Sequence, residues 1–168
     1  SQGSCWIGGN VAENSGGARA VKYGVTKDYV LNMEVVLPNG EIIWTGANTL
    51  KNSTGYNLTQ LMVGSEGTLG VITKIVLKLL PQNTNSVLML VPFFKASQAC
   101  EAVSAIFRAG IIPSALEFME RDAIDWTLKY NDNISINVKD NVQAHLLIEV
   151  DGNYHEILMQ EAEKIMNV

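Results

Sequence analysis

The hydrophobic positions of the chain change their period near Pro81, which predicts two regions of different architecture. Before Pro81, short apolar and β-branched runs are separated by glycines, whereas after it such runs alternate with longer stretches of helical period. Asn39-Gly40 lies between the first two runs, and both residues tolerate the positive φ angles of a hairpin turn. The first region is predicted to hold strands at residues 29–37, 41–46 and 71–80, with one or two helical turns at 57–62.

The second region has the pattern of a split βαβ unit. It predicts strands at residues 86–93, 113–119 and 143–150, and helices at 96–109, 120–130 and 154–166. The apolar face expected in the last strand consists of Ala144, Leu146, Ile148 and Val150. The first helix is expected to bury Ala99, Val103, Ile106 and Phe107. The last helix is expected to bury Tyr154, Ile157, Leu158, Ala162, Ile165 and Met166. A split βαβ unit has one more strand, and the first region begins at a glycine-rich loop without a preceding strand. The chain is therefore interpreted as an internal piece of a longer protein.

Composition places the boundary between the two regions. The chain has 168 residues, of which 47% are apolar and 17% charged, so it suits one ordinary domain or two small ones and is too apolar to be disordered. Twelve of the 14 glycines precede residue 71, and residues 81–168 hold 12 acidic side chains against six basic ones. Pro81 and the polar residues 82–85 have the composition of a linker. We predict an α+β protein with domains at residues 1–81 and 82–168.

Charge and residue spacing exclude several classes of function. The net charge of −5, without a basic stripe, argues against nucleic acid as a partner. No apolar run approaches the roughly 18 residues needed to span a membrane, and the start lacks the pattern of a signal peptide. Cys5 and Cys100 lie far apart, which favours reduced thiols in the cytoplasm. His145 and His155 are the only histidines and do not cluster, so no metal site is predicted.

The first candidate for ligand binding is the glycine-rich segment at residues 7–17, IGGNVAENSGG. Glycines let backbone N–H groups approach an anion such as a diphosphate, and Glu13, Asn14 and Ser15 can add hydrogen bonds from their side chains. The segment matches neither the P-loop nor the GxGxxG pattern, so taken alone it favours two tight turns.

The second candidate is a glycine loop that leads directly into a strand, at residues 64–73, GSEGTLGVIT. Backbone groups at the start of such a strand can pair with the polar edge of a flat ring or with a phosphate. Taken alone, the segment also describes an ordinary turn before a buried strand.

Together, in this order and with the sequence between them, the two motifs resemble the PCMH-type FAD-binding family typified by vanillyl-alcohol oxidase. The similarity is greatest to the branch of glycolate oxidase flavin subunits and FAD-linked D-lactate dehydrogenases. The matching segments are residues 7–17, 22–42, 51–73 and 77–81, and residues 91–103 and 114–124 resemble the start of the family's C-terminal FAD-oxidase domain. Ser15 and Asn32 depart from the pattern, where Ala and Gly are frequent.

The resemblance implies a fold and a set of cofactor contacts. Residues 1–81 would be the second portion of a PCMH-type FAD-binding domain, and residues 82–168 the start of a ferredoxin-like C-terminal substrate domain, which is truncated. The residues implied to contact FAD are Gly8, Gly9, Glu13, Asn14, Ser15, Gly16, Gly17, Glu66, Gly67, Gly70, Val71 and Ile72. No catalytic residue or metal ligand is carried over, because the family's PGGNTG-type loop and its GHxGDGNxH-type motif do not occur in this sequence.

The resemblance also implies an activity. It is the FAD-dependent oxidation of a 2-hydroxy acid, of the glycolate or D-lactate type, to the 2-oxo acid, with electrons passed to an acceptor or an electron-transfer subunit. The enzyme would be cytoplasmic, and both a peripheral position at the inner membrane and a homo-oligomer are compatible with it. The fragment alone is expected to be inactive and to bind FAD weakly or not at all. The alternative is a flavin-free companion or assembly subunit of the same fold in an electron-transfer complex.

Overall fold

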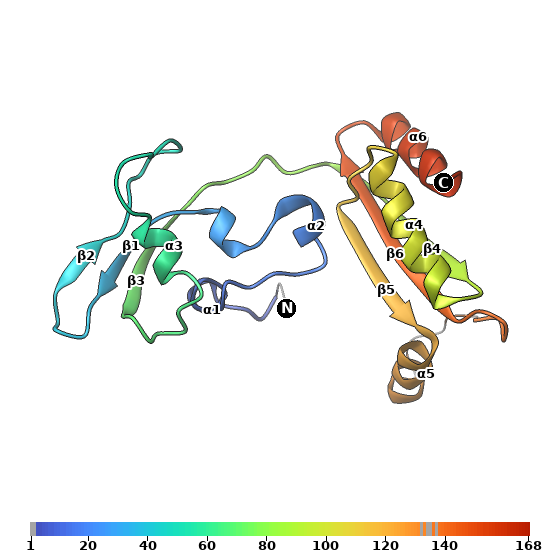
Figure 1. Ribbon diagram of the computed structural model, residues 1–168, viewed down its shortest axis with the longest axis horizontal. Coiled ribbons are helices and arrows are strands. Elements are labelled where there is room, and N and C mark those ends of the chain that lie inside the picture. The colour runs from blue at the N-terminus through green and yellow to red at the C-terminus, as the bar shows by residue number, and fades with distance from the viewer. Residues whose placement is uncertain (1–2, 132, 134–135, 137) are drawn as a thin grey trace. The chain divides into compact units, whose positions relative to one another are not determined.

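The chain forms two compact units. The computed structural model describes residues 3–131, 133, 136 and 138–168 (Figure 1). One unit consists of Ser1–Gly17 and Gly24–Pro81, and the other of Ala18–Tyr23 and Gln82–Val168. The chain thus crosses between the units three times, and the short segment at residues 18–23 belongs to the second unit although the first unit surrounds it in sequence.

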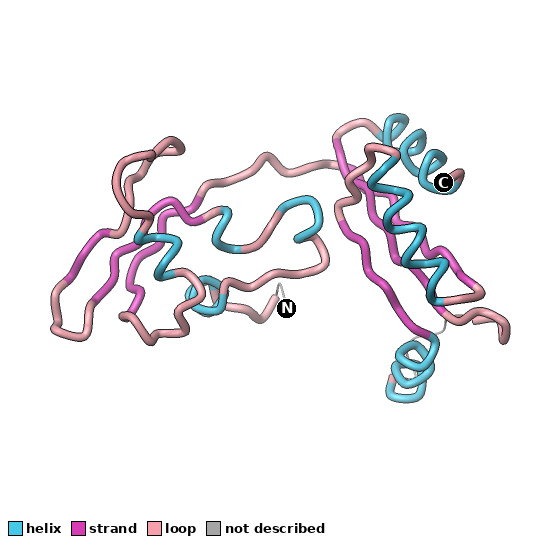
Figure 2. Tube along the Cα trace, viewed as in Figure 1, coloured by secondary structure: helices cyan, strands magenta, loops and turns pink. Residues whose placement is uncertain are grey.

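The first unit is a small antiparallel sheet with two short helices on one face. Its elements are α1 (Ile7–Glu13), the 3-10 helix η1 (Thr26–Asp28), β1 (Val30–Val36), β2 (Ile42–Trp44), α3 (Leu58–Met62) and β3 (Val71–Leu77). The strand order is β2-β1-β3, as the magenta segments of Figure 2 show. The predicted hairpin is confirmed, because the Leu37 amide donates to the Glu41 carbonyl at 2.8 Å and Gly40 has a φ of 85°.

Residues 7–13 form a helix, whereas the sequence predicted a glycine-rich loop there. Ile7 and Val11 stand four residues apart, and Val11 is fully buried in the core beside Met33, Val35 and Met62. Burying an aliphatic side chain of this size contributes about 1.5–3 kcal/mol, which is comparable to the helix penalty of two glycines at roughly 1 kcal/mol each. Backbone hydrogen bonds from Gly64 and Glu66 to the carbonyls of this helix add to the gain. The local preference of two glycines was therefore overridden by packing that the sequence pattern did not reveal.

The second unit is an antiparallel sheet covered on one face by two long helices. Its elements are α2 (Ala20–Tyr23), β4 (Asn85–Phe93), α4 (Ala96–Arg108), β5 (Ala115–Glu120), α5 (Arg121–Tyr130), β6 (Ala144–Gly152) and α6 (His155–Met166). The strand order is β4-β6-β5, with β6 in the centre. Helices α4 and α6 lie over one face of this sheet (Figure 1). This mixed arrangement confirms the predicted α+β class and the alternation of strands and helices.

The alternation predicted for the central strand is confirmed, but the helical faces are narrower than expected. All four predicted side chains of β6 are buried, namely Ala144, Leu146, Ile148 and Val150. In α4, Ile106 is buried whereas Phe107 is 42% exposed. Met166 at the end of α6, and Tyr154 directly before this helix, lie mostly in solvent. A helix on a flat sheet buries only the side chains that point directly at the strands.

Within the described residues, no helix has the length and apolar character needed to cross a membrane.

Two leucines on opposite faces of the second sheet test this arrangement. Leu146→Ala is expected to lower the free energy of unfolding by about 2–5 kcal/mol, because it opens a cavity in the core. Leu88→Ala removes a side chain that is 64% exposed, and its cost is expected to stay below about 1 kcal/mol. Denaturant unfolding of both variants measures the difference. Equal losses would contradict the strand register described above.

Candidate functional site

The two glycine-rich motifs lie against each other and are joined by their backbones. The amide of Gly64 donates to the Val11 carbonyl at 3.0 Å, and the amide of Glu66 donates to the Ala12 carbonyl at 2.9 Å. The first bond reaches the end of α1, and the second starts the turn that leads to β3. Two segments that are about fifty residues apart in sequence therefore form one continuous backbone surface in the first unit.

The end of the first motif is held in place by η1. Asn14 ends α1 in the left-handed region, with a φ of 53°, which asparagine tolerates better than most residues. Its side-chain oxygen Oδ1 accepts a hydrogen bond from the Lys27 amide at 2.9 Å. The Ser15 carbonyl accepts from both the amide and the hydroxyl of Thr26, at 3.1 and 2.8 Å. Asn14 and Ser15 thus have structural partners within the unit besides any ligand.

The second motif is a tight turn with several residues in the left-handed region. Gly64, Glu66 and Gly67 have φ angles of 79°, 50° and 77°. The hydroxyl of Thr68 closes the turn by donating to the Ser65 carbonyl at 2.6 Å. Glycine adopts such angles without strain, but a glutamate there costs about 1–2 kcal/mol. Strain of this kind concentrates at ligand-binding and catalytic sites, so Glu66 marks the turn as a functional candidate.

The glycines of the two motifs are required for different reasons. A Cβ atom on Gly70 would lie 2.7 Å from Cγ1 of Val35 and 2.8 Å from the Val36 carbonyl oxygen, so packing against β1 explains this glycine. A Cβ atom on Gly8, Gly9 or Gly17 would meet nothing within 4 Å. The described part of the chain therefore offers no packing reason for these three glycines.

Most of the predicted contact residues are open to solvent. Exposed are Gly8, Gly9, Glu13, Gly16, Gly17, Glu66, Gly67 and Val71, and half-buried are Asn14, Ser15, Gly70 and Ile72. Ile72 packs against the core of the first unit, so its side chain has a structural role. Trp6, directly before α1, is 85% exposed. The structure thus joins the two motifs at α1 and the turn after Gly64, and it leaves most of the predicted residues accessible to solvent.

Two residues outside the predicted set of cofactor contacts also shape the first unit. Gly64 joins the two motifs and has a positive φ, and a Cβ atom there would lie 3.2 Å from Cβ of Asn14. Asn32 stands where the family pattern has glycine, and its side chain is buried. Its Oδ1 accepts from the Gly46 amide at 2.7 Å, and its Nδ2 donates to Oδ1 of Asn48 at 2.8 Å. A buried asparagine with both ends paired stabilises the loop after β2. An asparagine in a strand of mostly apolar residues was the signal for it.

The two histidines lie outside this region. His145 is buried on β6, and its Nδ1 has no hydrogen-bond partner among the described residues. Burial, with the nearby charge of Arg121, lowers the pKa of His145 and keeps the ring neutral near pH 7. His155 is exposed at the start of α6. In the described ranges, no group of three or more His, Cys, Asp or Glu residues could hold a metal ion.

Two family profiles match the chain. The profile described as "FAD binding domain" matches residues 1–46, and the profile described as "FAD linked oxidases, C-terminal domain" matches residues 81–168. The second match covers more than half of the chain.

Curated proteins with similar sequences carry related names. The chain is 45% identical over 159 residues to the glycolate oxidase subunit GlcD of Bacillus subtilis, which covers 95% of the chain and 33% of that protein. It is 42% identical over 166 residues to a D-lactate dehydrogenase of Anaerostipes hadrus, covering 96% of the chain and 35% of that protein. The chain thus spans about a third of the length of these relatives.

A solved structure of an alkyldihydroxyacetonephosphate synthase has the same fold. It superposes with a TM-score of 0.73 at 23% sequence identity, covering 95% of the chain and 30% of that protein.

A pair of substitutions in the second motif tests the strain at the turn. Glu66→Gly is expected to raise the free energy of unfolding by up to about 1 kcal/mol, because glycine adopts the left-handed region freely. Gly67→Ala is expected to lower it by about 1 kcal/mol for the opposite reason. Chemical denaturation of the two variants gives both values. A stabilising Gly67→Ala or a clearly destabilising Glu66→Gly would contradict the backbone conformation of the turn.

Proposed function

The chain belongs to the FAD-linked oxidases, and from this we propose that it is part of an FAD-dependent oxidoreductase that oxidises a 2-hydroxy acid to a 2-oxo acid. The substrate proposed is of the glycolate or D-lactate type, in line with the names of the similar proteins from B. subtilis and A. hadrus. An electron acceptor or electron-transfer subunit would complete the reaction. In this proposal residues 1–81 are the second portion of the FAD-binding domain, and residues 82–168 begin the substrate domain.

The observation that carries the proposal is the junction of the two glycine motifs. The hydrogen bonds from Gly64 and Glu66 to the carbonyls of α1 bring both motifs to one surface. A dinucleotide is long enough to contact two such neighbouring segments. Had the motifs stood on opposite sides of the unit, one cofactor could not have reached both.

The residues present fit the cofactor in a second way, through the glycines of α1. Gly8 and Gly9 stand side by side in a helix of seven residues, where each costs about 1 kcal/mol relative to alanine. Neither a positive φ nor a neighbouring atom of the described chain requires them. A group outside this chain that approaches the backbone closely would explain both glycines, and the diphosphate or ring edge of FAD is such a group.

The chain's own contribution would be to bind and orient the cofactor. We propose contacts to FAD through Gly8, Gly9, Glu13, Asn14, Ser15, Gly16, Gly17, Glu66, Gly67, Gly70, Val71 and Ile72. Most of these contacts would be made by the backbone, which the turn at Glu66 and the cap at Asn14 hold rigid. When bound, FAD supplies the redox chemistry. No residue of this chain is assigned the role of general base.

The activity is tested with the full encoded protein. We expect the purified protein to show flavin absorbance and to reduce an artificial dye when D-lactate or glycolate is added. Anaerobic bleaching of the flavin band by glycolate, D-lactate or L-lactate, each added alone, would identify the substrate and, for lactate, its enantiomer. A colourless protein that neither binds added FAD nor responds to 2-hydroxy acids would overturn the proposal and favour the flavin-free companion subunit.

Alanine at the helical glycines should separate stability from cofactor binding. Gly8→Ala and Gly9→Ala are each expected to raise the free energy of unfolding of the apoprotein by about 0.5–1 kcal/mol, because alanine favours the helix. The same changes are expected to raise the dissociation constant of FAD at least about fivefold, the effect of losing roughly one hydrogen bond. Denaturant unfolding and FAD titration measure the two effects.

A matched control for this experiment is Ser104→Ala, at an exposed position of α4. It is expected to stabilise its helix slightly and to leave FAD affinity unchanged. Unaltered FAD affinity in both glycine variants would contradict the assignment of this helix to the cofactor.

A further inference from the structure

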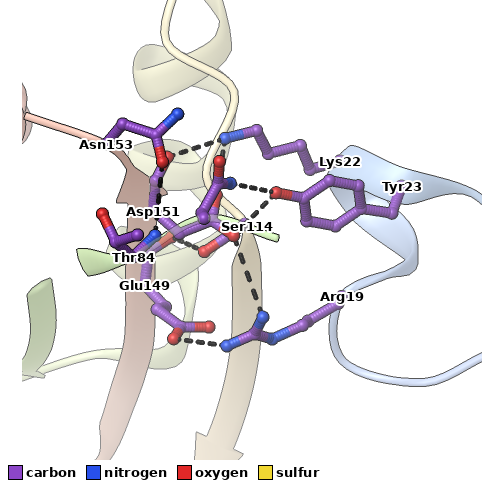
Figure 3. A network of polar contacts seen from close by, with 9 residues as sticks. Arg19, Lys22, Tyr23, Thr84, Ser114, Glu149, Asp151 and Asn153 are labelled. Atoms are coloured by element: carbon purple, nitrogen blue, oxygen red, sulfur yellow. Dashed lines mark hydrogen bonds and ion pairs between the residues drawn. The ribbon is translucent and has the colours of Figure 1, made fainter. Parts of the chain in front are cut away.

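The segment Ala18–Tyr23 is bound to the second unit through side chains of α2 and its flank. It lies against the sheet face that α4 and α6 leave uncovered, because Glu149 and Asp151 alternate along β6 with the buried core residues. Figure 3 shows Arg19, Lys22 and Tyr23 pointing toward these two carboxylates. We call residues 18–23 the strap.

Asp151 is the centre of the network. Lys22 Nζ donates to Oδ1 of Asp151 at 2.6 Å and to its backbone carbonyl at 3.0 Å. The hydroxyl of Tyr23 donates to the other carboxylate oxygen, Oδ2, at 2.6 Å. In turn, Nδ2 of Asn83 donates to the Tyr23 hydroxyl at 2.8 Å. The Asp151 side chain is only 4% exposed, and the hydrogen bonds from Lys22 and Tyr23 pair both of its oxygens.

Arg19 adds a weaker contact at the edge. Its guanidinium lies 2.7 Å from Oε1 of Glu149 and 3.8 Å from Oδ2 of Asp151. The Arg19 side chain is 58% exposed, and ion pairs of exposed side chains contribute little because water and salt screen them. The strap is therefore held mainly by the buried carboxylate and its two donors.

The protonation states fit an ionised carboxylate with a neutral phenol. Burial alone would raise the pKa of Asp151, but hydrogen bonds from Lys22, Tyr23 and Asn83 outweigh it and hold this pKa below its usual value. Burial and the hydrogen bond to Asp151 raise the pKa of Tyr23 to about 12. Asp151 thus stays ionised and Tyr23 stays neutral throughout the neutral range.

The position of the strap in the sequence gives the network its significance. Gly17, the last residue of the first glycine motif, is followed directly by Ala18, and Tyr23 is followed by Gly24 of the first unit. A contact on β6 therefore fixes the chain at Lys22, five residues after Gly17, which ends the first glycine motif. The residue pair that makes it, Lys22 and Asp151, is 129 positions apart.

We propose that Asp151 is a positioning residue for the cofactor: by anchoring the strap, it restricts Gly16 and Gly17, at the end of the first glycine motif, to the backbone arrangement that binds FAD. The inference rests on the proposed function. Because a flexible segment loses conformational freedom on binding, a segment that is already anchored at one end binds more tightly. Removing one partner from a buried charge network frees the strap, since the remaining groups then favour water.

The test uses the full encoded protein with Asp151→Asn, and with Tyr23→Phe as a milder variant that removes one hydrogen bond. The matched control is Ile106→Ala or Ile106→Val, whichever lowers the melting temperature by the same amount. Ile106 is buried in the core of the second unit and does not touch the strap network. FAD titration gives the dissociation constant, and brief trypsin digestion reports the release of the strap through cleavage after Arg19 and Lys22.

We expect Asp151→Asn to raise the dissociation constant of FAD about tenfold and Tyr23→Phe about threefold. Trypsin should cut the strap faster in the same order. The Ile106 control should leave FAD affinity within about twofold and cleavage at the strap unchanged.

Three results would overturn the inference. Asp151→Asn could release the strap without changing FAD affinity, it could leave the strap protected, or the Ile106 control could weaken FAD binding equally. If Asp151→Asn does not fold, Tyr23→Phe decides in the same way. Failure of the proposed function is distinguishable, because the unmodified protein would then bind no FAD, while trypsin would still report whether Asp151 anchors the strap.

Discussion

Backbone hydrogen bonds between the two glycine-rich segments are the contact on which the candidate site depends. A peptide N–H that is turned inward must find an acceptor, and those of Gly64 and Glu66 find the carbonyls of Val11 and Ala12. The contact uses no side-chain atoms, although the positive φ angles at Gly64 and Glu66 favour glycine at both positions. Half of the twelve proposed contact residues are glycines, which leave backbone groups open to a ligand, and our proposal places FAD there.

The glycines of this surface illustrate how a binding site and a stable fold make opposite demands. Gly70 is needed by the fold, because β1 leaves no room for a side chain. Gly8 and Gly9 weaken the helix in which they lie, and no other part of the described chain comes within 4 Å of where a Cβ atom would stand on either. Glu66 also lowers the stability of the fold, because its backbone is strained within the turn. Residues that lower the stability of a fold without a structural reason indicate a ligand-binding site.

The second unit contributes a different kind of constraint, which is electrostatic. Asp151 is removed from water and depends on Lys22 and Tyr23 for compensation, so the strap and the sheet form one structure. The same sheet uses its other face for an apolar core under α4 and α6. A single central strand thus supports a hydrophobic core with one set of side chains and a polar anchor with the alternating set.

Much of the fold and of the candidate site was determined by the sequence itself. The turn at Asn39-Gly40, the alternation along β6 and the order of strands and helices after Pro81 are local patterns, because they depend on residues within a few positions of one another. The family resemblance also identified the two motifs and the cofactor. Tertiary structure alone decided that residues 7–13 form a helix, that Phe107 and Met166 remain exposed, and that Lys22 meets Asp151. These outcomes depend on which surfaces meet after folding, and a contact between residues 129 positions apart leaves no periodic signal in the sequence.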